Sequence, residues 1–110
     1  RDLATELRVR RGALSALARV VSLVKRLVHG EEKQVELYDD MERAVILLLD
    51  EVEDEDVDAW ELLTVARVLF NLGYLSKESL PNNLLETREK RKMLLELVNS
   101  GIQASGLYHV

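Results

Sequence analysis

Residues 3–28 read LATELRVRRGALSALARVVSLVKRLV, and the architecture expected for the chain follows from this stretch. Apolar residues recur in it every three or four positions, which predicts one amphipathic helix over the whole segment. One heptad seam position holds Leu7, Leu14, Val21 and Val28, and the other holds Leu3, Leu17 and Val24. Gly30 directly follows His29 and is the residue expected to end this helix.

Apolar spacing predicts three further helices, at residues 31–52, 57–72 and 84–99. The second of these contains the run Ala44–Leu49, which is apolar on every side and is expected to be the most buried segment. Asp56 is a suitable N-cap for the third helix, and Gly101 is the expected end of the fourth.

A short connection at Gly30 predicts that the first two helices form an antiparallel pair. The last two helices are expected to pack across this long helical hairpin, giving one all-α domain of four helices over residues 1–110. The tail, residues 102–110, is predicted to form either a small hairpin turning at Ser105-Gly106 or a short helix. One proline and five glycines among 110 residues suit long helices better than a β-rich fold.

The composition indicates a folded domain rather than an acidic disordered tail. Apolar residues make up 47% of the chain, which is enough for a core despite a formal net charge of −5. The chain has no cysteine, which excludes disulfides and thiolate metal sites and suits an intracellular, cytoplasmic location. The longest apolar run, Ala44–Leu49, is far shorter than the ~20 residues that cross a bilayer, so no membrane span is expected.

Charge is strongly segregated along the sequence. Residues 1–29 carry seven Lys/Arg and two Asp/Glu, whereas residues 30–61 carry two Lys/Arg and fourteen Asp/Glu. If the chain turns back at Gly30, Arg8 lies opposite Glu53, so the basic start of one helix lies beside the acidic end of the next. We therefore interpret the segregation mainly as pairing within the hairpin, with ~0.2–1 kcal/mol from each exposed pair.

Arg10 departs from the heptad, because it occupies the seam position between Leu3 and Leu17 where leucine is expected. An arginine at such a position is costly unless it meets a carboxylate. One interpretation is that its side chain reaches solvent near the helix end, or pairs with Asp50 or Glu51. The other is a buried ion pair that sets the register, or a contact with a second chain.

The acidic run has the spacing of a calcium loop at Asp54, Asp56 and Asp58, but it fails where the loop geometry is strict. The sixth and twelfth positions hold Ala59 and Val65 in place of the required Gly and Glu. We therefore expect a solvated acidic loop that caps the third helix, with no bound metal and no cofactor.

Catalysis finds no support in the sequence. His29 and His109 have neither a cysteine partner nor the spacing of a metal-binding pair. No phosphate-binding loop, dinucleotide-binding motif or nucleophile elbow occurs. The chain is therefore expected not to be an enzyme and to have no small-molecule substrate.

The sequence favours a non-enzymatic helical protein-interaction module, a small subunit or adaptor of a larger complex, or a homo-oligomer. The apolar stripe over Val20–Val28 is broader than one hairpin covers, and such a stripe is often completed by another chain. The expected partner contacts are the apolar residues Val20, Leu23, Leu27 and Trp60 and the arginines Arg8, Arg10, Arg19 and Arg26.

The alternative is nucleic-acid binding. Residues 57–110 have the element order of a winged-helix unit if the tail forms a wing, and this is a likeness of fold order alone. The candidate phosphate contacts are the basic cluster Arg88, Lys90, Arg91 and Lys92. The negative overall charge counts against this alternative, because a basic footprint is expected of such proteins.

Overall fold

The computed structural model describes residues 10–28 and 34–106. Within them the chain is helical, without strands, and the predicted all-α class is confirmed. The helices are α2 (Arg11–Leu27), α3 (Val35–Asp50), α4 (Val57–Asn71), α5 (Leu84–Glu89) and α6 (Arg91–Ser105), with single 3-10 turns η1 (Asp54–Asp56) and η2 (Lys77–Ser79).

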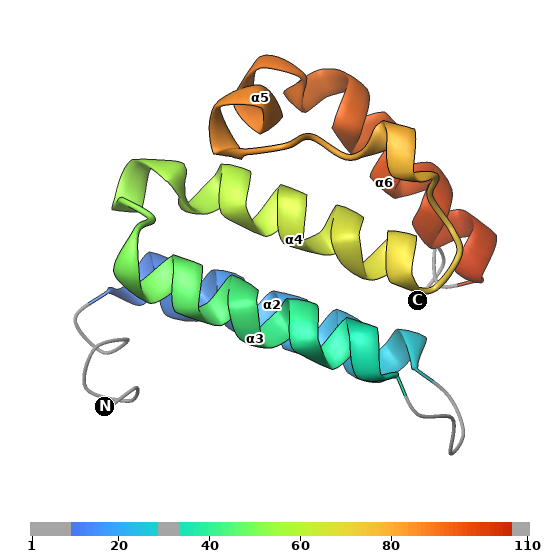
Figure 1. The fold of residues 1–110 in the computed structure, drawn as a ribbon, viewed down its shortest axis with the longest axis horizontal. Coiled ribbons are helices and arrows are strands. Elements are labelled where there is room, and N and C mark those ends of the chain that lie inside the picture. Colours follow the sequence, from blue (N-terminus) through green and yellow to red (C-terminus); the bar gives the residue numbers. More distant parts are fainter. Residues whose placement is uncertain (1–9, 29–33, 107–110) are drawn as a thin grey trace.

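Helix α4 occupies the middle of the molecule and contacts α2, α3, α5 and α6 (Figure 1). The α2 and α3 helices lie on one side of it, and α5 and α6 lie on the other. Most of its side chains are buried, because apolar residues fall on nearly every face of this helix. The buried set is Val57, Ala59, Trp60, Leu62, Leu63, Thr64, Ala66, Val68 and Leu69.

The prediction that Ala44–Leu49 would be the most buried segment is wrong. Within this run only Leu48 is fully buried, and Ile46 keeps 48% of its surface exposed. The physical reason is position: α3 lies at the edge of the molecule and has the core on one side only, whereas α4 has helices on both sides. An apolar run identifies a helix without identifying its neighbours.

Helices α2 and α3 run in opposite directions (Figure 1). At one end, Arg10 donates hydrogen bonds to backbone carbonyls of Leu48 and Val52. At the other end, Val28 and Tyr38 line the same hollow. The residues expected to form the connection, His29 and Gly30, lie outside the described residues, as does the predicted partner contact Arg8.

The helix predicted at 84–99 is two helices, and its predicted end is wrong. Lys90 separates α5 from α6, and α6 continues through Gly101 to Ser105. Gly106, with φ of +87°, supplies the left-handed residue that ends it. Residues 102–105 are helical, so they do not form the first strand of the predicted hairpin at Ser105-Gly106. Residues 107–110, the other half of that predicted hairpin, lie outside the described part.

Gly101 is buried against α4 rather than placed at a helix end. A Cβ atom at this position would lie 3.1 Å from Leu69 Cδ1 and 3.6 Å from the Tyr74 carbonyl oxygen. The missing side chain therefore lets α6 approach α4 closely, and this use of glycine overrides its usual role as a helix terminator.

We expect Gly101→Val to destabilise the protein by about 1–3 kcal/mol, because the added methyl groups overpack the α4–α6 contact. Urea-unfolding curves followed by circular dichroism measure this. Gly12→Val is the matched control, since nothing lies within 4 Å of a Cβ at Gly12, which is exposed on α2. Equal losses in both variants would contradict the close-packing role.

Candidate functional site

A cleft of about 570 Å³ lies between α3, α4 and the segment Asn82–Leu85, and it is called here the α3/α4 cleft. Its apolar lining comes from all three segments and is contributed by Ala44, Leu47, Trp60, Leu63, Leu84 and Leu85. Its polar lining consists of Arg43, Glu51, Thr64, Arg67, Asn82 and Asn83. This volume falls in the ordinary range for small-molecule sites.

Trp60 is fixed in the floor of the cleft. Its side chain is 1% exposed, and its Nε1–H donates a 2.8 Å hydrogen bond to the Ala44 carbonyl oxygen. The bond ties the start of α4 to the middle of α3 and satisfies the one polar group of the indole. The floor is therefore a rigid apolar surface.

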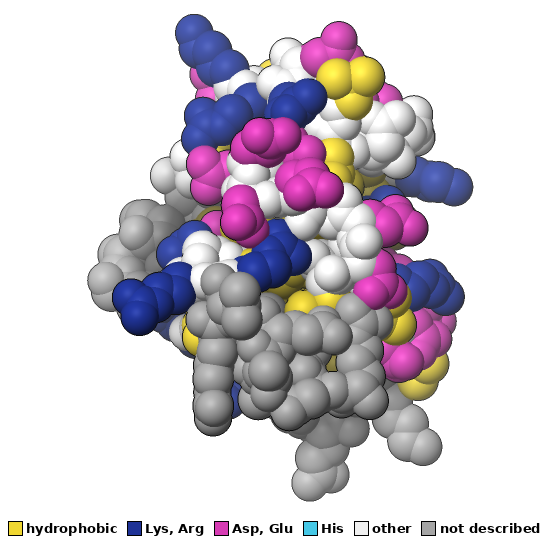
Figure 2. All heavy atoms as spheres, turned by 90° about the vertical axis from the view of Figure 1, so that its left-hand side faces the viewer, with side chains coloured by type: hydrophobic (Ala, Val, Ile, Leu, Met, Phe, Trp, Pro, Cys, Tyr) yellow, Lys and Arg dark blue, Asp and Glu magenta, His cyan; other side chains and the backbone are white. Residues whose placement is uncertain are grey.

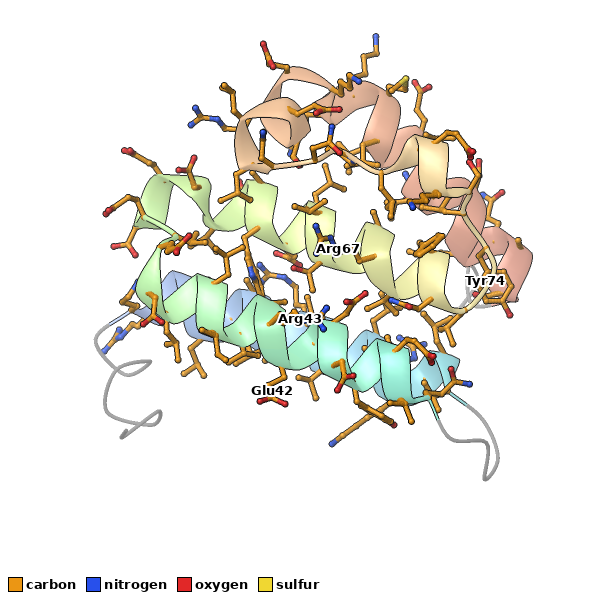
Figure 3. The ribbon with its side chains drawn as sticks, in the orientation of Figure 1. Glu42, Arg43, Arg67 and Tyr74 are labelled. Carbon is orange, nitrogen blue, oxygen red and sulfur yellow. The ribbon has the colours of Figure 1, made fainter. Side chains whose placement is uncertain are left out.

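Two arginines line one end of the cleft, Arg43 from α3 and Arg67 from α4. Figure 3 shows both of them between these two helices. Arg43 makes a long 3.4 Å contact with Asp40, whose other carboxylate oxygen accepts a 2.7 Å bond from Asn71. Arg67 makes no ion pair with any other described residue. Glu51, the residue that follows the end of α3, lines the cleft eight residues beyond Arg43, about 12 Å away by helical rise.

The third wall of the cleft is held by a capped helix start. The Asn83 side chain accepts a 2.8 Å bond from the Glu86 backbone N–H, and Thr87 donates to the Asn83 carbonyl oxygen. Glu86 reaches back to accept from Asn82, and Lys90 donates to its other oxygen at 3.1 Å. These bonds fix the Asn82–Leu85 wall, as a capping box does.

Arg10 clamps the end of α3. Its guanidinium donates to the Leu48 and Val52 carbonyl oxygens at 2.7 and 2.6 Å and to Asp54 Oδ1 at 2.8 Å. Carbonyls at a helix C-terminus lack partners within the helix, so a guanidinium fork satisfies them well. The expected pairing with a carboxylate is found, and Asp54 supplies it rather than the Asp50 or Glu51 of the prediction.

The other charged pairs join the acidic segment to α2 and α5. Arg19 binds both oxygens of Glu61 on α4, at 2.7 and 2.6 Å, and this hydrogen bonding raises the pKa of Arg19. Arg88 donates to Asp56 at 2.7 Å. Figure 2 shows the acidic side chains gathered at the end of the molecule that carries η1, with Lys and Arg side chains next to them.

Three of the apolar residues predicted to contact a partner are in the core. Val20, Leu27 and Trp60 are buried at 0%, 6% and 1% exposure, so their surface is already covered by this chain. The prediction of these three as surface contacts is wrong, because the α2 face that carries Val20 and Leu27 packs on α4. Leu23 is half-buried, and Arg26 is exposed.

A second hollow is lined both by predicted protein-partner contacts and by a predicted nucleic-acid contact. Arg19, Leu23 and Arg91 all line a space of about 340 Å³ between α2, α4 and α6. The Arg19–Glu61 pair neutralises much of its charge. In the predicted nucleic-acid cluster, Arg88 and Lys90 are held in ion pairs, and Lys92 is exposed.

An apolar surface also remains on α2 and α3. Leu14, Val21 and Tyr38 are exposed, with 43%, 36% and 55% of their surface accessible. Val28 and Met41 are half-buried beside them, and a hollow of about 380 Å³ lies between the two helices here. We call these five residues the α2/α3 outer face; Leu14, Val21 and Tyr38 are its exposed members, and Val28 and Met41 also pack against the core.

Neither Arg43 nor Arg67 was singled out from the sequence, and one signal was present for Arg67. It is the only charged residue between Leu62 and Phe70 in an otherwise apolar helix. No signal connected it to Arg43 or to Asn82, because the three come from separate segments. Among the described residues, no group of three or more His, Asp or Glu side chains is arranged to hold a metal ion.

Comparison of the chain with protein-family models, with curated proteins and with solved structures gives no match. No helix in the described ranges has the length and apolar character needed to cross a bilayer. The described residues thus form an all-α fold that carries the α3/α4 cleft and the α2/α3 outer face.

We expect Arg10→Ala to lower the free energy of unfolding by about 2 kcal/mol, because three acceptors lose a charged donor. Arg10→Lys recovers only part of this, since one ammonium cannot reach all three acceptors. Chemical unfolding at low and high salt measures both variants. Arg11→Ala, an exposed neighbour, is the control and should stay within about 0.5 kcal/mol of the wild type.

The Asn82–Leu85 wall has a predicted pH dependence. Hydrogen bonds from Lys90 and from the Asn82 backbone lower the pKa of Glu86 below its ordinary 4.5. A lowered folded-state pKa gives stability that is present at neutral pH and is lost as pH falls through that pKa. Glu86→Gln should therefore be less stable than wild type at pH 7.

The loss of stability in Glu86→Gln, relative to wild type, should shrink as the pH falls below 4.5 toward the lowered pKa of Glu86. The reason is that the wild-type carboxylate becomes protonated there. Thermal unfolding across this pH range measures it. Glu89→Gln, at an exposed position on the same helix, is the control. A pH-independent deficit for Glu86→Gln would count against the charged contacts as its cause.

Proposed function

We propose that this chain is a non-enzymatic helical interaction module, a small subunit or adaptor that docks a protein partner on the α2/α3 outer face. The observation that carries the proposal is the exposure of Val21 and Tyr38 around one hollow between α2 and α3, with Leu14 exposed two turns before Val21 on α2. Single exposed apolar residues are ordinary, whereas a contiguous group with a hollow between two helices is typical of a docking surface.

The spacing of these residues suits a helical partner. Leu14, Val21 and Val28 fall seven residues apart along α2, and Tyr38 and Met41 stand one turn apart on α3. A partner helix laid along such a seam would insert side chains between the two rows, as in helix-in-groove recognition. The predicted long helical hairpin is part of this proposal, since α2 and α3 present the surface together.

This surface replaces the residues first expected to make the contact. Val20 and Leu27 pack inward, whereas Leu14 and Val21, which share one of the predicted seam positions, are exposed. The apolar stripe of α2 is thus broad enough for two tasks: one edge covers α4 and the other is left for a partner.

The alternative function, nucleic-acid binding through Arg88, Lys90, Arg91 and Lys92, has weaker support. Arg88 is paired with Asp56 and Lys90 with Glu86, so phosphate binding would have to compete with these contacts. The helical run to Ser105 also removes part of the sequence that a wing would need. Measuring DNA and RNA affinity against salt tests this alternative.

The proposed function predicts association that depends on the outer face. Light-scattering mass is measured from micromolar to millimolar protein for wild type and for the double variant Leu14→Glu/Tyr38→Glu. We expect the wild type to associate, or to retain a partner from its native source, and the double variant to do neither, because two buried carboxylates oppose docking. Met93→Glu, equally exposed but on α6, is the control.

Two results together would overturn this function: a wild type that stays monomeric throughout, and a set of retained proteins unchanged by the double variant. Circular dichroism of each variant excludes loss of fold as the cause. The control matters because an effect of added negative charge alone would reduce association of the Met93→Glu variant as well.

A further inference from the structure

The α3/α4 cleft has an apolar floor and a charged end, which together specify the chemistry of an occupant. Leu47, Leu84 and Leu85 supply the accessible apolar surface for an alkyl chain, above the buried Trp60 and Leu63. Each methylene buried on such a surface strengthens binding about threefold to fourfold. An unbranched apolar chain therefore gains affinity with every carbon that the cleft accommodates.

The charged end selects an anion. Arg43 and Arg67 approach it from different helices, so two guanidinium groups are available to one ligand group. Guanidinium forks match the geometry of a carboxylate, which they bind with paired hydrogen bonds. Arg67 has no competing ion pair among the described residues, and the contact of Arg43 with Asp40 is long, at 3.4 Å.

The charged residues at the two ends of the cleft set the orientation of a bound ligand and limit the charge that this ligand can carry. Glu51 lines the far end, so it repels an anion placed there and favours the arginine end. Asp40 lies close to the arginines and offsets part of their charge. A single negative charge fits this balance better than a dianion does, which favours carboxylate over phosphate.

We propose that the α3/α4 cleft binds a free aliphatic carboxylic acid, with the carboxylate held by Arg43 and Arg67 and the alkyl chain lying against Leu47, Leu84 and Leu85. The ligand is bound and not transformed. This site is separate from the α2/α3 outer face, because the two surfaces use different sides of α3. A negative result for ligand binding in the cleft therefore leaves the proposed protein docking on the outer face untouched, and the reverse is also true.

Trp60 makes the site directly observable. It is the single tryptophan of the chain and lines the cleft floor, so its fluorescence reports occupancy. The probes are octanoate, decanoate and dodecanoate, each below its micelle concentration, with decan-1-ol and decylamine as matched neutral and cationic chains. We expect saturable one-to-one binding that strengthens about tenfold for each two carbons. Decylamine should bind at least tenfold more weakly than decanoate.

Variants separate the two parts of the site. Arg67→Ala and Arg43→Ala should each weaken decanoate binding about tenfold and leave decan-1-ol binding unchanged, since only the carboxylate contact is lost. Arg26→Ala, an exposed cation on α2 away from the cleft, is the matched control and should change neither. Unfolding curves confirm that each variant is folded.

The proposal is overturned if decanoate gives no saturable signal, if decan-1-ol binds as tightly as decanoate, or if neither arginine variant weakens decanoate. It is also overturned if a short peptide with adjacent leucine and glutamate, such as N-acetyl-Leu-Glu, binds at least tenfold more tightly than decanoate. That result would assign the cleft to a protein segment.

Discussion

Helix α4 is apolar on nearly all its faces, and the rest of the structure is arranged to cover it. An exposed helix of this kind would leave large apolar side chains such as Trp60 and Leu69 in water, whereas here both are buried. The α2 and α3 helices cover one side, and α5 and α6 cover the other. Close approach on the α6 side requires the missing side chain of Gly101. The α3/α4 cleft arises where this cover is incomplete, beside Thr64 and Arg67 of α4.

Charge pairing then orients the elements around this core. Arg10, Arg19 and Arg88 come from α2 and α5 or their ends, and each pairs with an acid between residues 54 and 61. The acidic segment is therefore a common partner for cations that are far apart in the sequence. The exposed pairs add little stability, ~0.2–1 kcal/mol each, so their main effect is to favour one arrangement over others. Arg10 differs, because it also satisfies backbone carbonyls at the end of α3.

Sequence periodicity predicted the helical class, the bounds of α4 to within one residue and the opposed directions of α2 and α3. It failed where an outcome depended on contacts between segments. The sequence predicts a helix end at Gly101, yet Gly101 lies inside α6, where it packs against Leu69. The break at Lys90 has no strong signal, because the residues on both sides favour helix. Pairing with a carboxylate was one of the alternatives predicted for Arg10, but the backbone carbonyls that it also binds cannot be predicted from side-chain types.

The position of α3 explains both of the surfaces to which function is assigned. Leu37 and Leu48 face the core, Tyr38 and Met41 border the outer face, and Ala44 and Leu47 line the cleft. A helix that contributes to three surfaces must be apolar on most of its circumference even though only one of those surfaces is the core. The run Ala44–Leu49 thus reflects several half-covered contacts rather than deep burial. Arg43 is exposed on α3 and lines the cleft beside Ala44 and Leu47, an arrangement that the proposed carboxylate contact requires.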